Sequence, residues 1–464
     1  FLLAAVAALL SALAYAEFAA RVPLSGSAYT FAYVTLGELA AWFIGSNLTL
    51  EYSISASAVA RGFSVNMAQM LSLWGAQLPA WLVGMPLNAY LDLSPLSALL
   101  IMVCTLTLCL GVQSSARFNI AMTVLNVSVI LFVVLLGASS MQLANFTPFV
   151  PNGYLAVLSG TGTVFFSFVG FDSVSTLAGE VKNPSRDLPL GICGTLGVAT
   201  FLYVAVSVVI CGMVSYQLID VSAPLSAAFQ SVGLDWAASV IAVASLVALT
   251  ATTLCSLLGQ PRIFYQMAVD GLLWPVFSKV DSRAVPIWGT IISGGFSALI
   301  ALFVDLQNLT EMISIGTLMA FALVCAGVII IRYRPDQPLT PAEDAARTRV
   351  LPPRFIPLLV VGFTVSSILF AASCVAQWGL WFSLPLALPP LVLYGLLQLQ
   401  VPVNIPMTFS CPLVPLLPCL GILANIFIIV GLPIESAYRV IIWSVLCFII
   451  YFAYGLHHSR LNRV

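Results

Sequence analysis

The sequence predicts an all-α membrane protein built as a polytopic helix bundle. Of its 464 residues, 61% are hydrophobic and 7% are charged, against about 25% charged in an ordinary soluble domain. Such a chain lacks the polar side chains to cover a surface in water, whereas a bilayer requires no such cover. Its apolar residues form runs of about twenty, and no long stretch alternates with period two as the strands of a membrane barrel do.

We expect thirteen transmembrane helices, because about 20 apolar residues cross a bilayer once. The expected spans cover residues 1–18, 38–60, 97–114, 119–139, 155–178, 189–214, 236–258, 287–305, 312–331, 356–376, 379–399, 413–431 and 438–456. The chain begins at Phe1 inside the first of these runs, without the basic leader of a signal peptide.

The positions of Lys and Arg support this assignment, because basic residues collect on the cytoplasmic side of a membrane protein. Only Arg61 and Arg439 fall on one side of the predicted membrane. The other side receives Arg21, Arg117, Lys182, Arg186, Arg262, Lys279, Arg283, Arg332, Arg334, Arg347, Arg349, Arg354, Arg460 and Arg463. The basic loops and the C-terminus are therefore predicted to face the cytoplasm. The first expected span then runs inward, so a chain starting in the cytoplasm would need one further helix before Phe1.

Composition also argues against several classes of function. The net charge of -1 carries no electrostatic footprint of a nucleic-acid partner. The two histidines, His457 and His458, both lie after the last apolar run, so an intramembrane enzyme is disfavoured and no catalytic residue is assigned. Most of the ten cysteines lie in apolar runs without metal-ligand spacing, so we expect neither a metal site nor a cofactor.

Two carboxylates lie in the interior of predicted spans, away from their ends, where an ionisable side chain costs roughly 2.5 to 3.5 kcal/mol and is a functional candidate. Glu51 falls near the middle of the second span and Asp172 lies in the fifth. We expect Glu51 to line a substrate or proton path; the alternative is a protonated carboxyl bonded to a neighbouring helix. Glu17, Glu180 and Asp187 lie near span ends, where we expect water to solvate them.

Glycines interrupt the apolar pattern around Asp172, at positions 160, 162 and 170. Glycine costs a helix about 1 kcal/mol relative to alanine, so this cluster needs a packing or functional reason. One reason is the close approach of a neighbouring helix. The other, which we favour, is a discontinuous helix that breaks near Gly170 and places Asp172 at the start of its second half, where the helix dipole stabilises negative charge.

Segments spread over nearly the whole chain, in the same order, resemble the cationic amino acid transporters of the amino acid, polyamine and organocation superfamily. They are YAEFAARVPLSGSAYTFAYVTLGE, FVGFDSVSTLAGEVKNPSRDLPLGI, QPRIFYQMAVDGLLWPVFSKV, MISIGTLMAFALVCAGVIIIRYRP and CPLVPLLPCLGILANIFIIV. The resemblance implies fourteen helices, of which ten form a five-plus-five inverted repeat and four follow it. The thirteen spans would be helices two to fourteen. The implied parts are a transporter core at 1–331, a cytoplasmic linker at 332–355, four C-terminal helices at 356–456 and a cytoplasmic tail at 457–464.

The resemblance also implies a substrate site between the broken first and sixth helices, the sixth being the segment from Gly160 to Lys182. The implied substrate-binding residues there are Phe165, Phe166, Ser167, Phe168, Val169, Gly170 and Asp172, with Phe166 or Phe168 as a lid. Glu51 would face the substrate side chain, where a carboxylate suits an ammonium or guanidinium group. Leu249, Thr250 and Thr253 of the eighth helix would line the pocket or simply pack. Asn126 falls in the coupling-ion region, where some relatives carry a lysine.

The function implied is transport of amino acids, with cationic arginine and lysine favoured, by alternating access that is either facilitated or proton-coupled. A permease of broader or neutral specificity and a non-transporting amino acid sensor remain alternatives. The expected partners are an amino acid, protons if transport is coupled, and the lipid bilayer. The plasma membrane and a vacuolar or lysosomal membrane are both compatible with the sequence.

Overall fold

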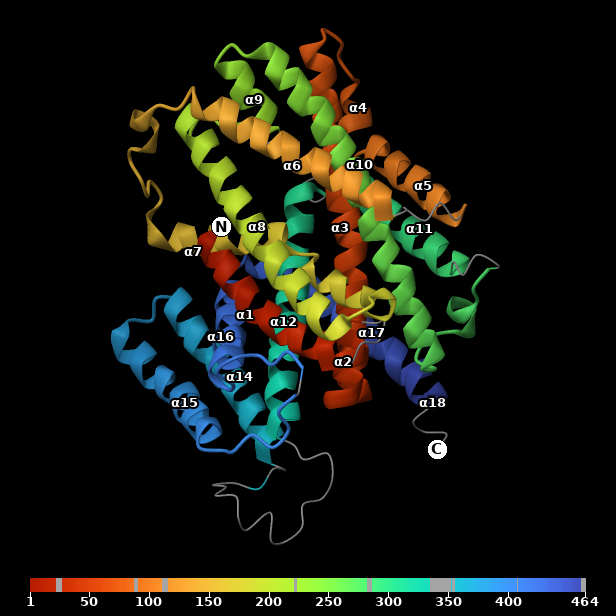
Figure 1. The fold of residues 1–464 in the computed structure, drawn as a ribbon, viewed down its shortest axis with the longest axis vertical. Helices are drawn as coiled ribbons and strands as arrows, with labels where there is room; N and C mark the ends of the chain where they lie inside the picture. Colours follow the sequence, from red (N-terminus) through yellow and green to blue (C-terminus); the bar gives the residue numbers. More distant parts are fainter. Residues whose placement is uncertain are drawn as a thin grey trace. The chain divides into compact units, whose positions relative to one another are not determined.

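The computed structural model describes residues 1–21, 27–86, 91–110, 116–220, 223–281, 286–333, 352, 355–406 and 408–459. Helices make up most of these residues (Figure 1). The predicted linker at 332–355 and tail at 457–464 lie largely outside the described part of the chain.

The helices and strands follow one another in a simple order. The α-helices are α1 (Leu2–Arg21), α2 (Ser27–Thr35), α3 (Glu38–Leu73), α4 (Ala80–Val83), α5 (Pro95–Cys109), α6 (Ala116–Ala138), α7 (Gly153–Phe165), α8 (Pro184–Met213), α9 (Pro224–Ser231), α10 (Asp235–Val269), α11 (Ile287–Phe303), α12 (Leu306–Tyr333), α14 (Ile356–Val375), α15 (Leu380–Gln398), α16 (Leu416–Gly431), α17 (Ile434–Ile450) and α18 (Leu456–His458). Short 3-10 helices are η1 (Leu143–Phe146), η2 (Phe166–Phe168), η3 (Phe171–Glu180) and η4 (Pro275–Ser278), and η6 (Tyr451–Gly455) is a π-helix. Two short strands, β1 (Met85–Pro86) and β2 (Asp92–Leu93), pair antiparallel.

Each of the thirteen expected spans overlaps a helix, which confirms the polytopic all-α prediction. Among the described residues, nine helical stretches are long and apolar enough to cross a membrane, and α5, α11 and α16 are shorter apolar helices. The thirteenth, α3, is the least apolar by sequence, since it carries Glu38, Glu51 and Arg61.

The sequence-based bounds of α3 are too short. The helix has 36 residues, which at 1.5 Å per residue is about 54 Å against roughly 30 Å of hydrocarbon. The apolar run ends at Arg61, but the helix continues because that side chain has partners: its Nε donates to the carbonyl of Ala301 at 2.7 Å and its guanidinium pairs with Asp92 at 2.6 Å.

Contacts divide the chain into two compact units, each described by itself below. Unit 1 comprises Phe1–Leu48, Tyr154–Gly197 and Ser314–His457, and unit 2 comprises Thr49–Gly153, Val198–Ile313 and His458–Val464. These units do not coincide with the predicted core at 1–331 and four C-terminal helices, and that division stays a prediction.

In unit 1, the C-terminal helices α16 and α17 pack on the first helices of the chain. Asn425 of α16 donates to the hydroxyl of Ser11 in α1 at 3.0 Å. Two indoles tie α17 to α3 reciprocally: Trp42 Nε1 donates to the carbonyl of Cys447 at 2.9 Å and Trp443 Nε1 donates to the carbonyl of Ser46 at 3.0 Å. These buried polar contacts fix the helices because nothing in hydrocarbon competes for the same groups.

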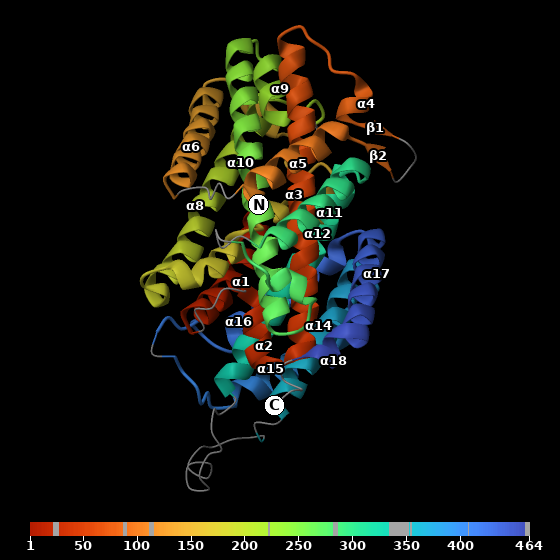
Figure 2. The same cartoon turned by 90° about the vertical axis from the view of Figure 1, so that its right-hand side faces the viewer.

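In unit 2, α3, α5, α10 and α11 form a closely packed group, with α5 beside α11 in both views (Figures 1 and 2). Gly259 of α10 faces the ring of Tyr52 in α3, where a Cβ would lie 2.7 Å from the ring. Next to it, Ser53 donates to Gln260 Oε1 at 2.7 Å. Ser57, one turn further along α3, donates to the carbonyl of Ser297 in α11 at 2.8 Å.

Candidate functional site

The helix that contains Gly170 is broken, as the glycine pattern predicts. The α-helix α7 ends at Phe165, and the short η2 follows it. Val169 then has an extended conformation, with ψ at 132°, and Gly170 has φ at +120° before η3 begins at Phe171. L side chains rarely adopt such a φ, so a glycine is required at the centre of the break.

Asp172 stabilises this break rather than lying free at the end of a half-helix. Its side chain is fully buried, and its Oδ1 accepts a hydrogen bond from the backbone N–H of Gly170 at 3.2 Å. Ser173 donates to the carbonyl of Gly170 through both its backbone, at 3.1 Å, and its hydroxyl, at 2.5 Å. Both backbone groups of Gly170 therefore have partners within three residues.

Aromatic rings hold the chain on both sides of the break. Phe165, before it, and Phe171, after it, each face the ring of Phe321 in α12, with centroids 6.0 Å and 4.9 Å away. Tyr15 of α1 completes the group, at 5.8 Å from Phe171 and 5.2 Å from Phe321. The position of the half-helix after Gly170 thus depends on α1 and α12.

The other predicted residues of the break differ in accessibility. Phe168 is 4% exposed, and its ring lies edge-on to that of Phe1 at 6.4 Å. Phe166, Ser167 and Val169 are half-buried. Of the two aromatic residues predicted as a lid, Phe166 is therefore the more accessible.

Glu51 lies on the face of α3 that is turned away from α10. Its side chain is 2% exposed. Ser53, two residues later, hydrogen-bonds to α10, and two residues of an α-helix are about 200° apart. The structure therefore separates Glu51 from the α3–α10 contact.

The predicted residues of α10 lie at another level of unit 2. The neighbours Tyr52–Gly259 and Gly62–Leu249 show that α3 and α10 run antiparallel. In that register Thr253 lies opposite the residues near position 58, about 10 Å along α3 from Glu51. Thr253 is fully buried, with its hydroxyl bonded to the carbonyl of Leu249, and Thr250 bonds likewise to Leu246, each at 2.8 Å. Leu249 thus packs near Gly62 of α3, and whether Leu249, Thr250 and Thr253 contact substrate stays a prediction.

Gln260 is a buried polar residue that the sequence analysis did not single out. It is 1% exposed and accepts the hydrogen bond from Ser53, while its Nε2 has no partner among the described residues. A search for charged groups in apolar runs does not find an amide. The signal that could have found it is an amide two residues after the predicted span 236–258, which can bond to a serine such as Ser53 inside the span 38–60.

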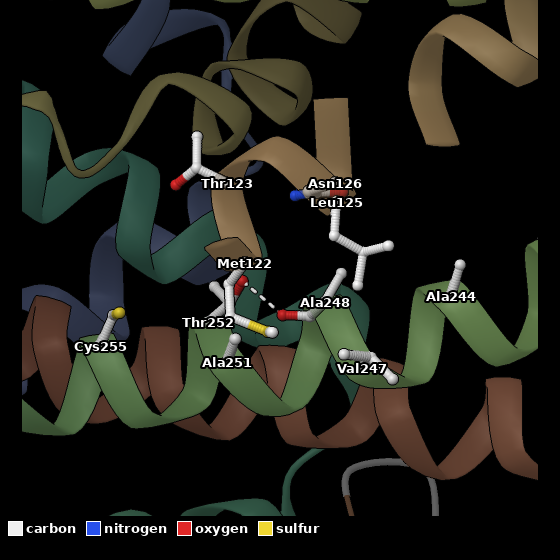
Figure 3. A pocket seen from close by; sticks show the side chains of 10 residues that line it. All are labelled: Met122, Thr123, Leu125, Asn126, Ala244, Val247, Ala248, Ala251, Thr252 and Cys255. Atoms are coloured by element: carbon white, nitrogen blue, oxygen red, sulfur yellow. Dashed lines mark hydrogen bonds between the residues drawn. The ribbon is translucent and has the colours of Figure 1, made fainter. Parts of the chain in front are cut away.

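Asn126 lines two neighbouring cavities of unit 2. One, of about 360 Å³, lies between α6 and α10, and the other, of about 250 Å³, also reaches Asn66 and Leu249. In the first, Asn126 and Leu125 of α6 face residues of α10, where Thr252 donates to the carbonyl of Ala248 at 2.9 Å (Figure 3). The structure thus brings Asn126 and Leu249 together, while Glu51 lines neither cavity.

Glu17 is the residue whose environment was predicted wrongly. The sequence analysis expected water to solvate it near a span end, but its side chain is 0% exposed and lies next to Arg332 and Arg21. The reason is tertiary: α12 and the connection between α15 and α16 cover this end of α1. Asp187, also expected to be solvated, is exposed, whereas the side chain of Glu180 lies outside the described residues.

Comparison with known proteins decides the family. A family model described as amino acid permease matches residues 1–397, and a second, described as the C-terminus of that permease, matches residues 409–459. This chain belongs to the amino acid permease family. It is an integral, multi-pass membrane transporter, in agreement with the sequence-based prediction of fold and function.

Individual relatives of this permease differ in the substrates they are named for. It is 36% identical to "Cationic amino acid transporter 4, vacuolar" of Arabidopsis thaliana, over 100% of this chain and 86% of the relative. It is 35% identical to the branched-chain amino acid permease BcaP of Bacillus subtilis (strain 168), over 100% and 86%. It is 39% identical to the methylthioribose transporter of the same bacterium, over 72% and 73%. Family membership alone does not select among these substrates.

Proposed function

We propose that this permease carries cationic amino acids, such as arginine and lysine, across a membrane by alternating access. The observation that carries the proposal is Glu51, a buried carboxylate within the transmembrane part of α3, on the face turned away from α10. A carboxylate in a low-dielectric region is stabilised by an opposite charge, and an ammonium or guanidinium group of the substrate supplies one. The similarity to a cationic amino acid transporter over the whole chain supports the same substrate class.

The break at Gly170 supports the carrier mechanism. An unwound stretch inside a transmembrane helix is tolerated where its backbone lines a cavity, and in transporters such stretches hold the charged groups of substrates. We assign the half-buried stretch Phe166–Gly170 to the α-amino and carboxylate groups of the substrate, with Phe166 as its aromatic lid. Asp172 acts by holding Gly170. The proposal involves no catalytic step, since the relatives are transporters.

A second candidate substrate class is neutral, branched-chain amino acids. The branched-chain permease matches this chain over its whole length at nearly the same identity as the cationic transporter. In this alternative Glu51 is a structural or proton-carrying group. A third hypothesis is a sensor, which binds amino acids without carrying them.

Uptake by the purified protein in proteoliposomes separates these candidates. The measurement is the initial uptake of labelled arginine in competition with unlabelled lysine, leucine and alanine, together with equilibrium binding of the same amino acids. The proposal predicts arginine uptake that lysine inhibits at least tenfold more strongly than leucine does. Stronger inhibition by leucine establishes the neutral alternative, and binding without uptake establishes the sensor.

A further inference from the structure

The strongest unassigned feature is a buried charge cluster at one end of unit 1, centred on Glu17. Arg332 of α12 donates from Nε to Glu17 Oε1 and from Nη2 to Oε2, each at 2.8 Å. Arg21, one turn after Glu17 in α1, forms an ion pair with Oε1 at 3.2 Å. The backbone N–H of Cys411 donates to Oε2 at 2.8 Å. The carboxylate is thus fully buried with donors from three parts of the chain.

The same cluster fixes the connection between α15 and α16, residues 399–415, of which residue 407 is not described. The backbone N–H groups of Val403 and Asn404 donate to the carbonyl of Arg332, at 2.8 Å and 3.0 Å. Arg21 donates to the carbonyl of Asn404 at 2.6 Å, and Arg332 donates to that of Cys411 at 3.3 Å. In Figure 1 this connection is the irregular blue segment between α15 and α16. The two arginines that pair with Glu17 therefore also hold this connection, Arg21 at Asn404 and Arg332 at Cys411.

The two helices that share Glu17 also hold the break. Tyr15, two residues before Glu17 in α1, and Phe321 of α12 are the rings that contact Phe171, directly after Gly170. Coupling between distant sites is carried by packed side chains and rigid helices. These ring contacts form a continuous physical path from the Glu17 end of α1 and α12 to the half-helix after Gly170.

We propose that Glu17 is a positioning residue for transport, which couples the α15–α16 connection to the broken helix by binding α1, α12 and that connection together. The hydrogen bonds of Glu17 are predicted to open when the half-helix moves during the transport cycle, so that Cys411 of the connection separates from Glu17. This inference rests on the transport function but not on which amino acid is carried.

Cys411 is a native cysteine whose labelling can report on this coupling, so no cysteine has to be introduced. Its side chain is 3% exposed. Burial, together with the neighbouring Glu17 carboxylate, raises the pKa of the Cys411 thiol to about 12. The thiolate is the species that reacts with maleimides, so the closed cluster should protect Cys411. Separation from Glu17 and exposure to water should make it reactive.

The test combines labelling with transport, in the full chain reconstituted in proteoliposomes. The rate at which N-ethylmaleimide labels Cys411 is the labelling rate of the protein minus that of its Cys411→Ser variant. It is measured with and without a saturating concentration of a transported amino acid. The inference predicts that substrate changes the labelling rate at least threefold in the unsubstituted protein. It predicts that Glu17→Gln labels at least fivefold faster whether substrate is present or not. The matched control is Glu435→Gln, which removes an exposed carboxylate at the start of α17 and should leave labelling unchanged.

Transport by the same variants distinguishes positioning from a merely structural role. Glu17→Gln should reduce the maximal uptake rate at least tenfold while substrate affinity changes less than threefold. Arg332→Lys keeps the positive charge but loses the bidentate contact with Glu17. Its maximal uptake rate should lie between those of the unsubstituted protein and Glu17→Gln. Normal uptake by Glu17→Gln overturns the inference, and so does a Cys411 labelling rate that substrate leaves unchanged in the unsubstituted protein. If the unsubstituted protein carries no amino acid, the transport function fails instead, while the labelling difference between it and Glu17→Gln remains measurable.

Discussion

Arg332 donates hydrogen bonds of 2.8 Å to each carboxylate oxygen of Glu17, a residue 315 positions earlier in the chain. Both side chains are almost completely buried. Replacing one partner of such a pair leaves the other charge buried without compensation, which costs about 3 to 5 kcal/mol. The contact therefore has a consequence for stability besides the one proposed for transport.

Glu17→Gln is expected to lower the thermal unfolding midpoint in detergent by several degrees, because it leaves the guanidinium of Arg332 uncompensated. Glu435→Gln, at an exposed position, is expected to change it by less than one degree. Intrinsic fluorescence during heating provides the measurement. Equal midpoints for the two variants would show that the buried pair contributes nothing measurable.

Gly170→Ala is expected to reduce uptake at least tenfold, because an alanine strains the backbone at a φ of +120°. Gly160→Ala is the matched control: Gly160 lies within α7, and a Cβ there meets no atom within 4 Å. That variant should retain uptake within twofold. If both variants transported equally well, the break at Gly170 would not be part of the transport mechanism.

Asp172→Asn is expected to retain uptake within about threefold, because the amide oxygen of asparagine can still accept the hydrogen bond from Gly170. Asp172→Ala removes the acceptor and should lose at least tenfold. The comparison of initial rates at equal protein abundance tells a positioning role from a charge that contacts substrate. Equal losses in both variants would indicate that the negative charge itself is needed.

Gly259→Ala is expected to destabilise the protein by about 1 to 3 kcal/mol, because the added methyl group would overlap the ring of Tyr52. Gly295→Ala in α11 adds the same group where no atom lies within 4 Å and should be neutral or stabilising. Unfolding midpoints of the two variants test the packing of α3 on α10. If Tyr52→Ala reduced the destabilisation caused by Gly259→Ala, the overlap with the tyrosine ring would be identified as its cause.

The sequence alone could predict much of this fold because long apolar runs identify membrane helices. The thirteen spans, the membrane location and the break at Gly170 follow from such runs and from the glycines inside one of them. The full length of α3 did not follow, since Arg61 ends the apolar run and its partners Ala301 and Asp92 lie far away in the sequence. The same holds for Glu17, whose burial depends on a helix more than 300 residues later.

The structure shows where the predicted site residues lie and what they contact. It places Phe165 and Asp172 as supports of the break, and it places Thr253 about 10 Å along α3 from Glu51. Periodicity identifies neither relationship, because both depend on how separate helices pack. Which of these residues touch the substrate stays a prediction.

Substrate selectivity of Glu51→Gln tests the central claim most directly. The measurement is the ratio of arginine to leucine uptake in proteoliposomes, for the unsubstituted protein, Glu51→Gln and the control Glu435→Gln. If Glu51 recognises the cationic side chain, Glu51→Gln lowers arginine uptake at least tenfold and leucine uptake less than threefold, while the control changes neither. An equal loss for both amino acids, or an unchanged ratio, would contradict a role for Glu51 in cation recognition.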